Sequence, residues 1–155
     1  MSTTRDSIRE SVGPSNCSIF LLFAVIVCSI SCGVPNLDPP ECTVSRSAVR
    51  EFYSFHFGND MSFSAENLQA RQKFITQQLY ASLASSVPGT DPFTTGTADI
   101  PKAFRVAACR ALSSERAEFE ILIFWKDDER SEQRTIRVEA EKIGEQWLVS
   151  RVVQG

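Results

Sequence analysis

The stretch that decides the fold is Arg116 to Trp125, RAEFEILIFW. Its apolar residues at every second position share one face of an extended chain, because successive side chains of a strand point to opposite faces. They are Ala117, Phe119, Ile121, Ile123 and Trp125. The opposite face begins with Glu118 and Glu120 and continues with the apolar Leu122 and Phe124. A strand that is apolar on both faces over half of its length is typical of the centre of a sheet.

The chain on both sides of this stretch repeats the two-residue period. We predict three further strands, Phe104 to Leu112, Gln133 to Glu141 and Gln146 to Val153. In the last of these, Trp147, Val149 and Val153 are expected on one face. Short polar turns at 113–115, 126–130 and 143–145 separate the strands. Consecutive strands with short turns predict a four-stranded antiparallel meander.

The residues before the strands have a helical period instead. We predict a first helix from Thr43 to Phe57, capped by Thr43 or Ser45 and ended by Gly58. Its expected buried stripe is Val44, Ala48, Phe52 and Phe55, flanked by Val49, Tyr53 and His56. So many aromatic side chains on one short helix indicate a wide apolar surface to cover, such as the concave side of a sheet.

Two further helical stretches follow. Ser64 is a good cap for AENLQARQKF and Thr76 for QQLYASLASS, although a single helix from Ala65 to Ser85 is an alternative. Helices come first and strands later, so the predicted class is α+β, with N-terminal helices packed on one face of a curved four-stranded antiparallel meander sheet.

The most apolar part of the chain precedes this domain. Ile19 to Cys32, IFLLFAVIVCSISC, has the length of a signal-peptide apolar region and is short for a membrane-spanning helix. Its end resembles the lipobox of bacterial lipoproteins, in which a small residue precedes a cysteine that is lipidated, here Cys32. Two alternatives remain: cleavage without lipid near Ser31 or Gly33, and an uncleaved anchor helix from Ile19 to Pro35.

These readings divide the chain into three parts. Residues 1–32 are a signal peptide with a lipobox-like end, residues 33–42 a Pro-rich tether, and residues 43–155 the α+β domain. The prolines of the tether, Pro35, Pro39 and Pro40, are expected to stop a helix from running on out of the signal. Each reading places the domain at the cell envelope, facing the periplasm or exterior; without an anchor it is secreted.

Charge and cysteine usage exclude several classes of protein. A net charge of −3 argues against a nucleic-acid partner, which needs a basic patch. One histidine and no CxxC pair leave no recognisable metal site, and we expect no cofactor. Cys42 and Cys109 are the cysteines that follow Cys32, and they form either a disulfide or two buried thiols. A disulfide would join the start of the first helix to the first strand.

Four short motifs carry a resemblance to a known family. They are Phe52-Tyr53, Leu79-Tyr80, Asp91-Pro92-Phe93 and Gln146-Trp147-Leu148-Val149. With helices first and a long meander after, Val44 to Val153 resembles the nuclear-transport-factor-2-like (ketosteroid-isomerase-like) superfamily, and more closely an uncharacterised set of bacterial envelope proteins with that domain. The resemblance implies a cone with an apolar pocket between helices and sheet.

The candidate pocket residues are Tyr53, His56, Asp91, Phe93 and Trp125. His56 beside Tyr53 is the best local constellation, since histidine titrates near neutral pH. The alternative is a helix histidine bonded to backbone. Asp91 and Phe93 belong to a polar loop, 90–101, which either plugs the core or forms the lip of a pocket. Trp125 is either a core side chain or a ligand-stacking one.

One further pair could mark the pocket mouth. Asp99 and Arg105 either meet there or form plain surface ion pairs. The acids of the strands fall on the solvent side of the alternation, and no catalytic pair is recognisable.

We therefore expect a lipid-anchored, non-catalytic envelope domain that binds a small apolar ligand or a partner protein. The alternative is an isomerase- or dehydratase-like enzyme, which needs two ionisable groups facing one apolar cavity. A third possibility is an assembly role through the open sheet face.

Overall fold

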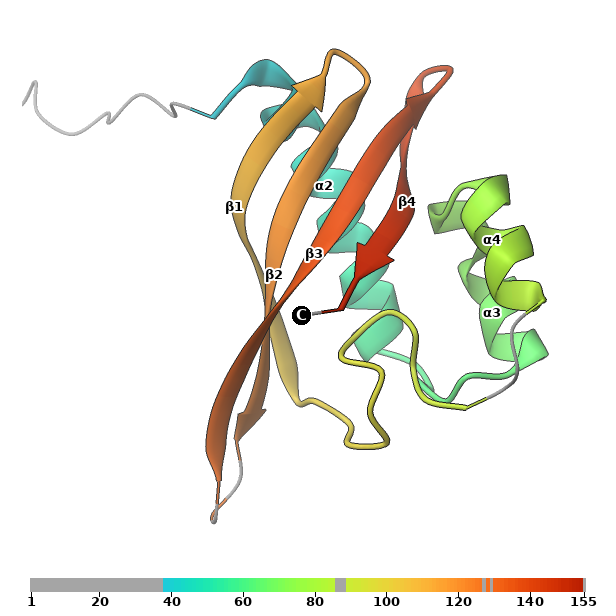
Figure 1. Cartoon of the computed structure of the whole chain (residues 1–155), viewed down its shortest axis with the longest axis vertical. Coiled ribbons are helices and arrows are strands. Elements are labelled where there is room, and N and C mark those ends of the chain that lie inside the picture. Colours follow the sequence, from blue (N-terminus) through green and yellow to red (C-terminus); the bar gives the residue numbers. More distant parts are fainter. Residues whose placement is uncertain (1–37, 86–88, 127, 129, 155) are drawn as a thin grey trace, which may run out of the picture. The chain divides into compact units, whose positions relative to one another are not determined.

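The computed structural model describes residues 38–85, 89–126, 128 and 130–154 (Figure 1). The signal-like segment and Cys32 lie outside these residues. The described part is an α+β domain in which three N-terminal helices pack on a four-stranded antiparallel sheet of order β1-β2-β3-β4. The predicted fold class is confirmed. Among the described residues, no helix is both long and apolar enough to cross a membrane.

The meander is built as the two-residue period predicts. Its strands are β1 (Ala103–Ser113), β2 (Arg116–Lys126), β3 (Ser131–Ile143) and β4 (Gln146–Val153). The β2 strand pairs with β1 on one side and β3 on the other, so it is central. Its core face is buried along its whole length, with exposed fractions of 0–1% from Ala117 to Trp125.

The helical half comprises α2 (Pro40–Phe57), α3 (Ala65–Arg71), a 3-10 turn η1 (Gln72–Phe74) and α4 (Gln77–Ala84). Both predicted caps are present, because Ser64 Oγ accepts from Asn67 N and Thr76 Oγ1 from Leu79 N. The alternative of one long helix is wrong. Thr76 is extended and donates its N–H to Val149 O across 2.9 Å, which ties the chain to the edge of β4.

The start and the buried face of α2 differ from the prediction. The helix begins at Pro40 rather than Thr43, since proline fits the first helical turn, where the missing N–H has no partner to lose. Val44, predicted as buried, is 55% exposed. The face in contact with the core is instead Cys42, Ser45, Val49, Phe52, Tyr53 and His56. This face includes the polar side chains of Ser45 and His56, which a search for apolar residues at helical spacing does not select.

A β-bulge also changes the face of one predicted core residue. Glu139 pairs with Arg151 and Ala140 with Val149, so Ser150 is an extra residue on β4. The extra residue shifts the alternation beyond it. Val152, opposite the buried Val138, therefore packs against the core, and the prediction that Val153 shares the face of Val149 is wrong.

Aromatic side chains fill the space between α2 and the sheet. Phe52 and Tyr53 are fully buried, and their rings lie 5.1 Å from Phe93 and 5.5 Å from Phe104 respectively. The sheet contributes Phe119 and Trp125 to the same core. The region in which the family resemblance implies an apolar pocket is thus occupied by the protein's own side chains.

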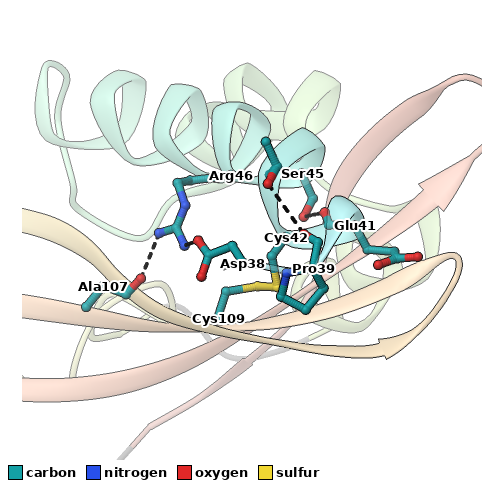
Figure 2. Close-up of a disulfide and its surroundings, with 9 residues drawn as sticks. Asp38, Pro39, Glu41, Cys42, Ser45, Arg46, Ala107 and Cys109 are labelled. Carbon is teal, nitrogen blue, oxygen red and sulfur yellow. Dashed lines mark hydrogen bonds and ion pairs between the residues drawn. A yellow bond between two sulfur atoms is a disulfide. The ribbon is translucent and has the colours of Figure 1, made fainter. Parts of the chain in front are cut away.

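A disulfide joins the start of α2 to β1 (Figure 2). It links Cys42 and Cys109, which are 67 residues apart in sequence. One turn further along α2, Arg46 pairs with Asp38 and donates to Ala107 O, 2.7 Å away. Ala107 lies where the register of β1 slips against β2, so Arg46 satisfies a carbonyl at an irregular point of the strand.

Candidate functional site

A buried polar cluster lies where α2, α3 and the loop before β1 meet. It consists of His56, Arg71, Asp91 and Thr94. His56 Nε2 lies 2.8 Å from Asp91 Oδ2, and Arg71 Nε lies 2.8 Å from His56 Nδ1. Thr94 Oγ1 donates to Asp91 Oδ2 over 2.8 Å. The side chain of His56 is 1% exposed and that of Asp91 11%.

The cluster fixes the protonation state of His56. A guanidinium only donates hydrogen bonds, so Nδ1 must present its lone pair to Arg71. The proton is then on Nε2 and is donated to the Asp91 carboxylate. His56 is thus a neutral bridge between a cation and an anion. The prediction of a histidine bonded to backbone missed this arrangement, because both partners are side chains from other segments.

Arg71 is held on all sides. Its Nη1 donates to Asn67 O and its Nη2 to Asp60 O, at 2.7 and 2.6 Å. Burial lowers the pKa of the Arg71 guanidinium, while the charges of Asp91 and Asp60 oppose that shift. Sequence reasoning did not select Arg71, since an arginine in a short polar helix gives no signal that it is buried.

Tyr53 and Phe93 close the other side of the cluster. The Tyr53 hydroxyl donates to Phe93 O over 2.8 Å, and Asp91 Oδ1 accepts from Phe93 N at 2.9 Å. Burial, and secondarily the negative charge of Asp91, raises the pKa of the Tyr53 hydroxyl well above its ordinary value. Tyr53 therefore stays protonated and serves as a fixed donor.

The cluster is closed to ligands. The hollow lined by His56, Arg71 and Asp91 is too small to hold a water molecule. Both ring nitrogens of His56 are already bonded, so neither is free for a substrate. The cluster holds three segments together and presents no reactive atom.

Asp91 also borders an open cleft on the surface, which we call the Met61–Ile100 cleft. Its volume is about 320 Å³, and its walls are mostly apolar. They include Met61, Thr94, Ala98, Asp99, Ile100 and Pro101. Ile100 is 59% exposed and forms part of the wall of this cleft. This cleft is the candidate binding site.

Trp125 and Asp99 lie beyond the buried cluster. Trp125 is 1% exposed and its Nε1 donates to Asp99 O at 3.4 Å, so its ring is part of the core. The Asp99 carboxylate pairs with Arg130 through two contacts of 2.7 and 3.2 Å rather than with Arg105. The hydrogen bond from Arg130 lowers the pKa of the Asp99 carboxyl. Of the five predicted pocket residues, four meet at the buried cluster and Trp125 does not.

Asp60 gives a pH-dependent prediction for the segment beside Arg71. Hydrogen bonds from the backbone and side chain of Ser62, and from Asn67, lower the pKa of its carboxyl. The ionised form is favoured on folding, so its stabilising effect is complete above the pKa of an unfolded aspartate and is lost as pH falls through the lowered value. We expect an NMR titration to place the Asp60 midpoint below that of an ordinary aspartate. Asn67→Ala should raise it; an unchanged midpoint would contradict this assignment.

The described residues contain no group of three or more His, Cys, Asp or Glu side chains placed to hold a metal ion.

No family model matches the chain, and no curated protein matches it. Among solved structures, it is similar to a protein of unknown function from Bacteroides thetaiotaomicron VPI-5482. The identity is 16%, the match covers 85% of this chain and 98% of the other, and the TM-score is 0.46.

Fold and cross-link together define the class of protein. It is an α+β domain of helices on a four-stranded meander, stapled by one disulfide among its described residues. Because disulfides persist in oxidising compartments, the Cys42–Cys109 bond points to an extracytoplasmic location.

Proposed function

We propose that this protein is a membrane-anchored envelope protein whose domain binds a partner protein, without catalysis, through the Met61–Ile100 cleft. The anchor is the lipid on Cys32, as the lipobox-like end of the apolar segment predicts. We also assign the domain to the nuclear-transport-factor-2-like superfamily, since its helices precede a four-stranded meander. The observation that carries the proposal is the position of the exposed Ile100 in the wall of an apolar cleft, on a loop that Asp91 bonds to the buried His56.

Three features support a partner protein over a small apolar ligand. The interior between α2 and the sheet is filled by buried aromatic side chains, so a binding site is expected on the surface rather than inside the domain. At about 320 Å³ this cleft is at the small end for a ligand pocket. Its lining combines polar groups, among them Thr97 and Asp99, with mostly apolar surface, and protein interfaces have such a mixture.

The enzyme alternative finds less support. An isomerase or dehydratase needs free ionisable groups that face a cavity. Asp91 and Asp99 border the Met61–Ile100 cleft, but their carboxylates are bonded to His56 and Arg130 respectively. His56 is buried, and both of its ring nitrogens are bonded within the protein. The Tyr53 hydroxyl donates its hydrogen bond to the backbone carbonyl of Phe93 rather than to an open site.

The proposal is tested by photocrosslinking in intact cells. A photoreactive phenylalanine analogue at position 100 is expected to give an adduct of discrete mass with one envelope protein. The same analogue at Val44, which is 55% exposed on α2, is the matched control and should give none.

The partner found in this way is then purified and its affinity measured. Ile100→Asp should weaken binding by about tenfold or more, because it places a charge in a desolvated apolar contact. Val44→Asp should leave the affinity unchanged. Equal effects of both substitutions, or adducts at both positions, would refute the assignment of the cleft. A small molecule retained in native mass spectra and lost in Ile100→Asp would replace the partner protein by a ligand.

A further inference from the structure

We infer that the end of the domain carrying the β1–β2 and β3–β4 turns faces the membrane, and that Leu112 and Ile143 contact lipid there. The inference rests on the proposed anchoring of the chain and adds to it an orientation and a lipid-contacting surface.

The two side chains are large, apolar and exposed. Leu112, the second-last residue of β1, is 39% exposed. Ile143, the last residue of β3, is 51% exposed. Both strands terminate at the same end of the antiparallel sheet (Figure 1). A hydrogen bond of 2.8 Å from Lys142 N to Glu115 O joins the two turns into one tip.

Single exposed apolar residues are common and need no explanation by themselves. The position of these two is what carries the argument, because the chain enters the domain at the same end. α2 begins there, and the disulfide holds Cys42 against Cys109, which lies three residues before Leu112 in β1 (Figures 1 and 2). Three strand residues span only about 10 Å.

The length of chain before α2 limits how far this end lies from an anchor. Five residues, 33–37, separate Cys32 from Asp38. Even fully extended, they reach at most about 20 Å. Of the two ends of the sheet, the one with Leu112 and Ile143 is therefore held near the membrane, and the opposite end with Ile100 faces away from it.

The charges at this end indicate what kind of contact it makes. Glu115 is exposed, and Glu145 is 97% exposed, 4.0 Å from Lys142. The tip therefore has no excess of basic side chains to attract anionic lipids. The contact is apolar, and the covalent anchor keeps it in place. Its extent should not depend on the content of anionic lipid.

The experiment uses the full chain, purified from membranes and added to preformed vesicles of dioleoyl phosphatidylcholine. Leu112→Trp and Ile143→Trp variants report contact with lipid through quenching by phosphatidylcholine brominated on its acyl chains. Ile100→Trp, at the opposite end and also exposed (59%), is the control. The signal of the parent chain, which has Trp125 and Trp147, is subtracted.

We expect brominated lipid to remove most of the added fluorescence at positions 112 and 143 and none at position 100. Replacing part of the lipid by phosphatidylglycerol should leave these values unchanged. Flotation of the same samples measures whether the chain is bound to vesicles, and so tests the anchoring separately from the orientation. If the chain floats with vesicles but positions 112 and 143 are not quenched, or position 100 is quenched equally, the orientation is wrong and the anchoring stands. If the chain does not float, the anchoring is wrong and the orientation falls with it.

Discussion

Replacing both Cys42 and Cys109 by alanine should lower the free energy of unfolding by about 4 kcal/mol. The bond closes a loop of 67 residues in sequence separation, and a cross-link over a loop of that length removes much of the entropy of the unfolded chain. Small domains have only about 5–15 kcal/mol of stability in total, so the loss is a large share of it.

Urea denaturation followed by circular dichroism measures the effect. The dependence of the free energy on urea should also become steeper, because the unfolded chain without the cross-link exposes more surface. Reductant supplies the control. It should bring the unaltered protein to the stability of the double variant and leave the double variant unchanged. Equal stability of the oxidised protein and the double variant would show that the bond does not constrain the domain.

Asp91→Ala should cost about 3 kcal/mol of stability, the second largest effect. Asp91 accepts hydrogen bonds from His56, Thr94 and the backbone of Phe93. Removing the carboxylate leaves these donors unpaired in a closed region, and each unpaired buried group costs about 1–3 kcal/mol. Because Arg71 donates to Nδ1 of His56, the ring proton is on Nε2, and without Asp91 it has no acceptor.

Two variants sharpen this result. Asp91→Asn keeps one acceptor oxygen and should lose less than Asp91→Ala. Asp99→Ala removes an ion pair whose partners are about 40% exposed, and it should cost much less than Asp91→Ala because solvent screens the pair. Nitrogen-15 chemical shifts of His56 should show the Nε2-protonated tautomer in the unaltered protein. A protonated Nδ1, or equal costs for Asp91→Ala and Asp99→Ala, would contradict the bridge.

The buried cluster explains how the cleft is held open. Asp91 lies between the buried cluster and the Met61–Ile100 cleft, because it is bonded to His56 on its inner side and lines the cleft on its outer side. The loop from Thr90 to Pro101 has no regular secondary structure, so it depends on such contacts for its position. Loops held this way by a rigid scaffold are the usual place for binding residues.

Local patterns in the sequence determined the class and order of the elements. The alternation from Arg116 to Trp125 predicted a central strand, and the caps at Ser64 and Thr76 predicted two helix starts. These features depend on residues within one turn or one strand, where backbone geometry alone sets the period. The same reasoning proposed Cys42 and Cys109 as partners and left their bond open.

Only the tertiary structure decided which side chains meet. His56 finds Arg71, 15 residues away, and Asp91, 35 residues away, and no local period encodes either pairing. The bulge at Ser150 turned Val152 inward, because one extra residue reverses a period of two. The aromatic side chains that fill the interior likewise come from α2, the loop and the sheet together. Short-range geometry therefore determined the type and order of the elements, whereas long-range packing determined the cluster, the filled core and the open cleft.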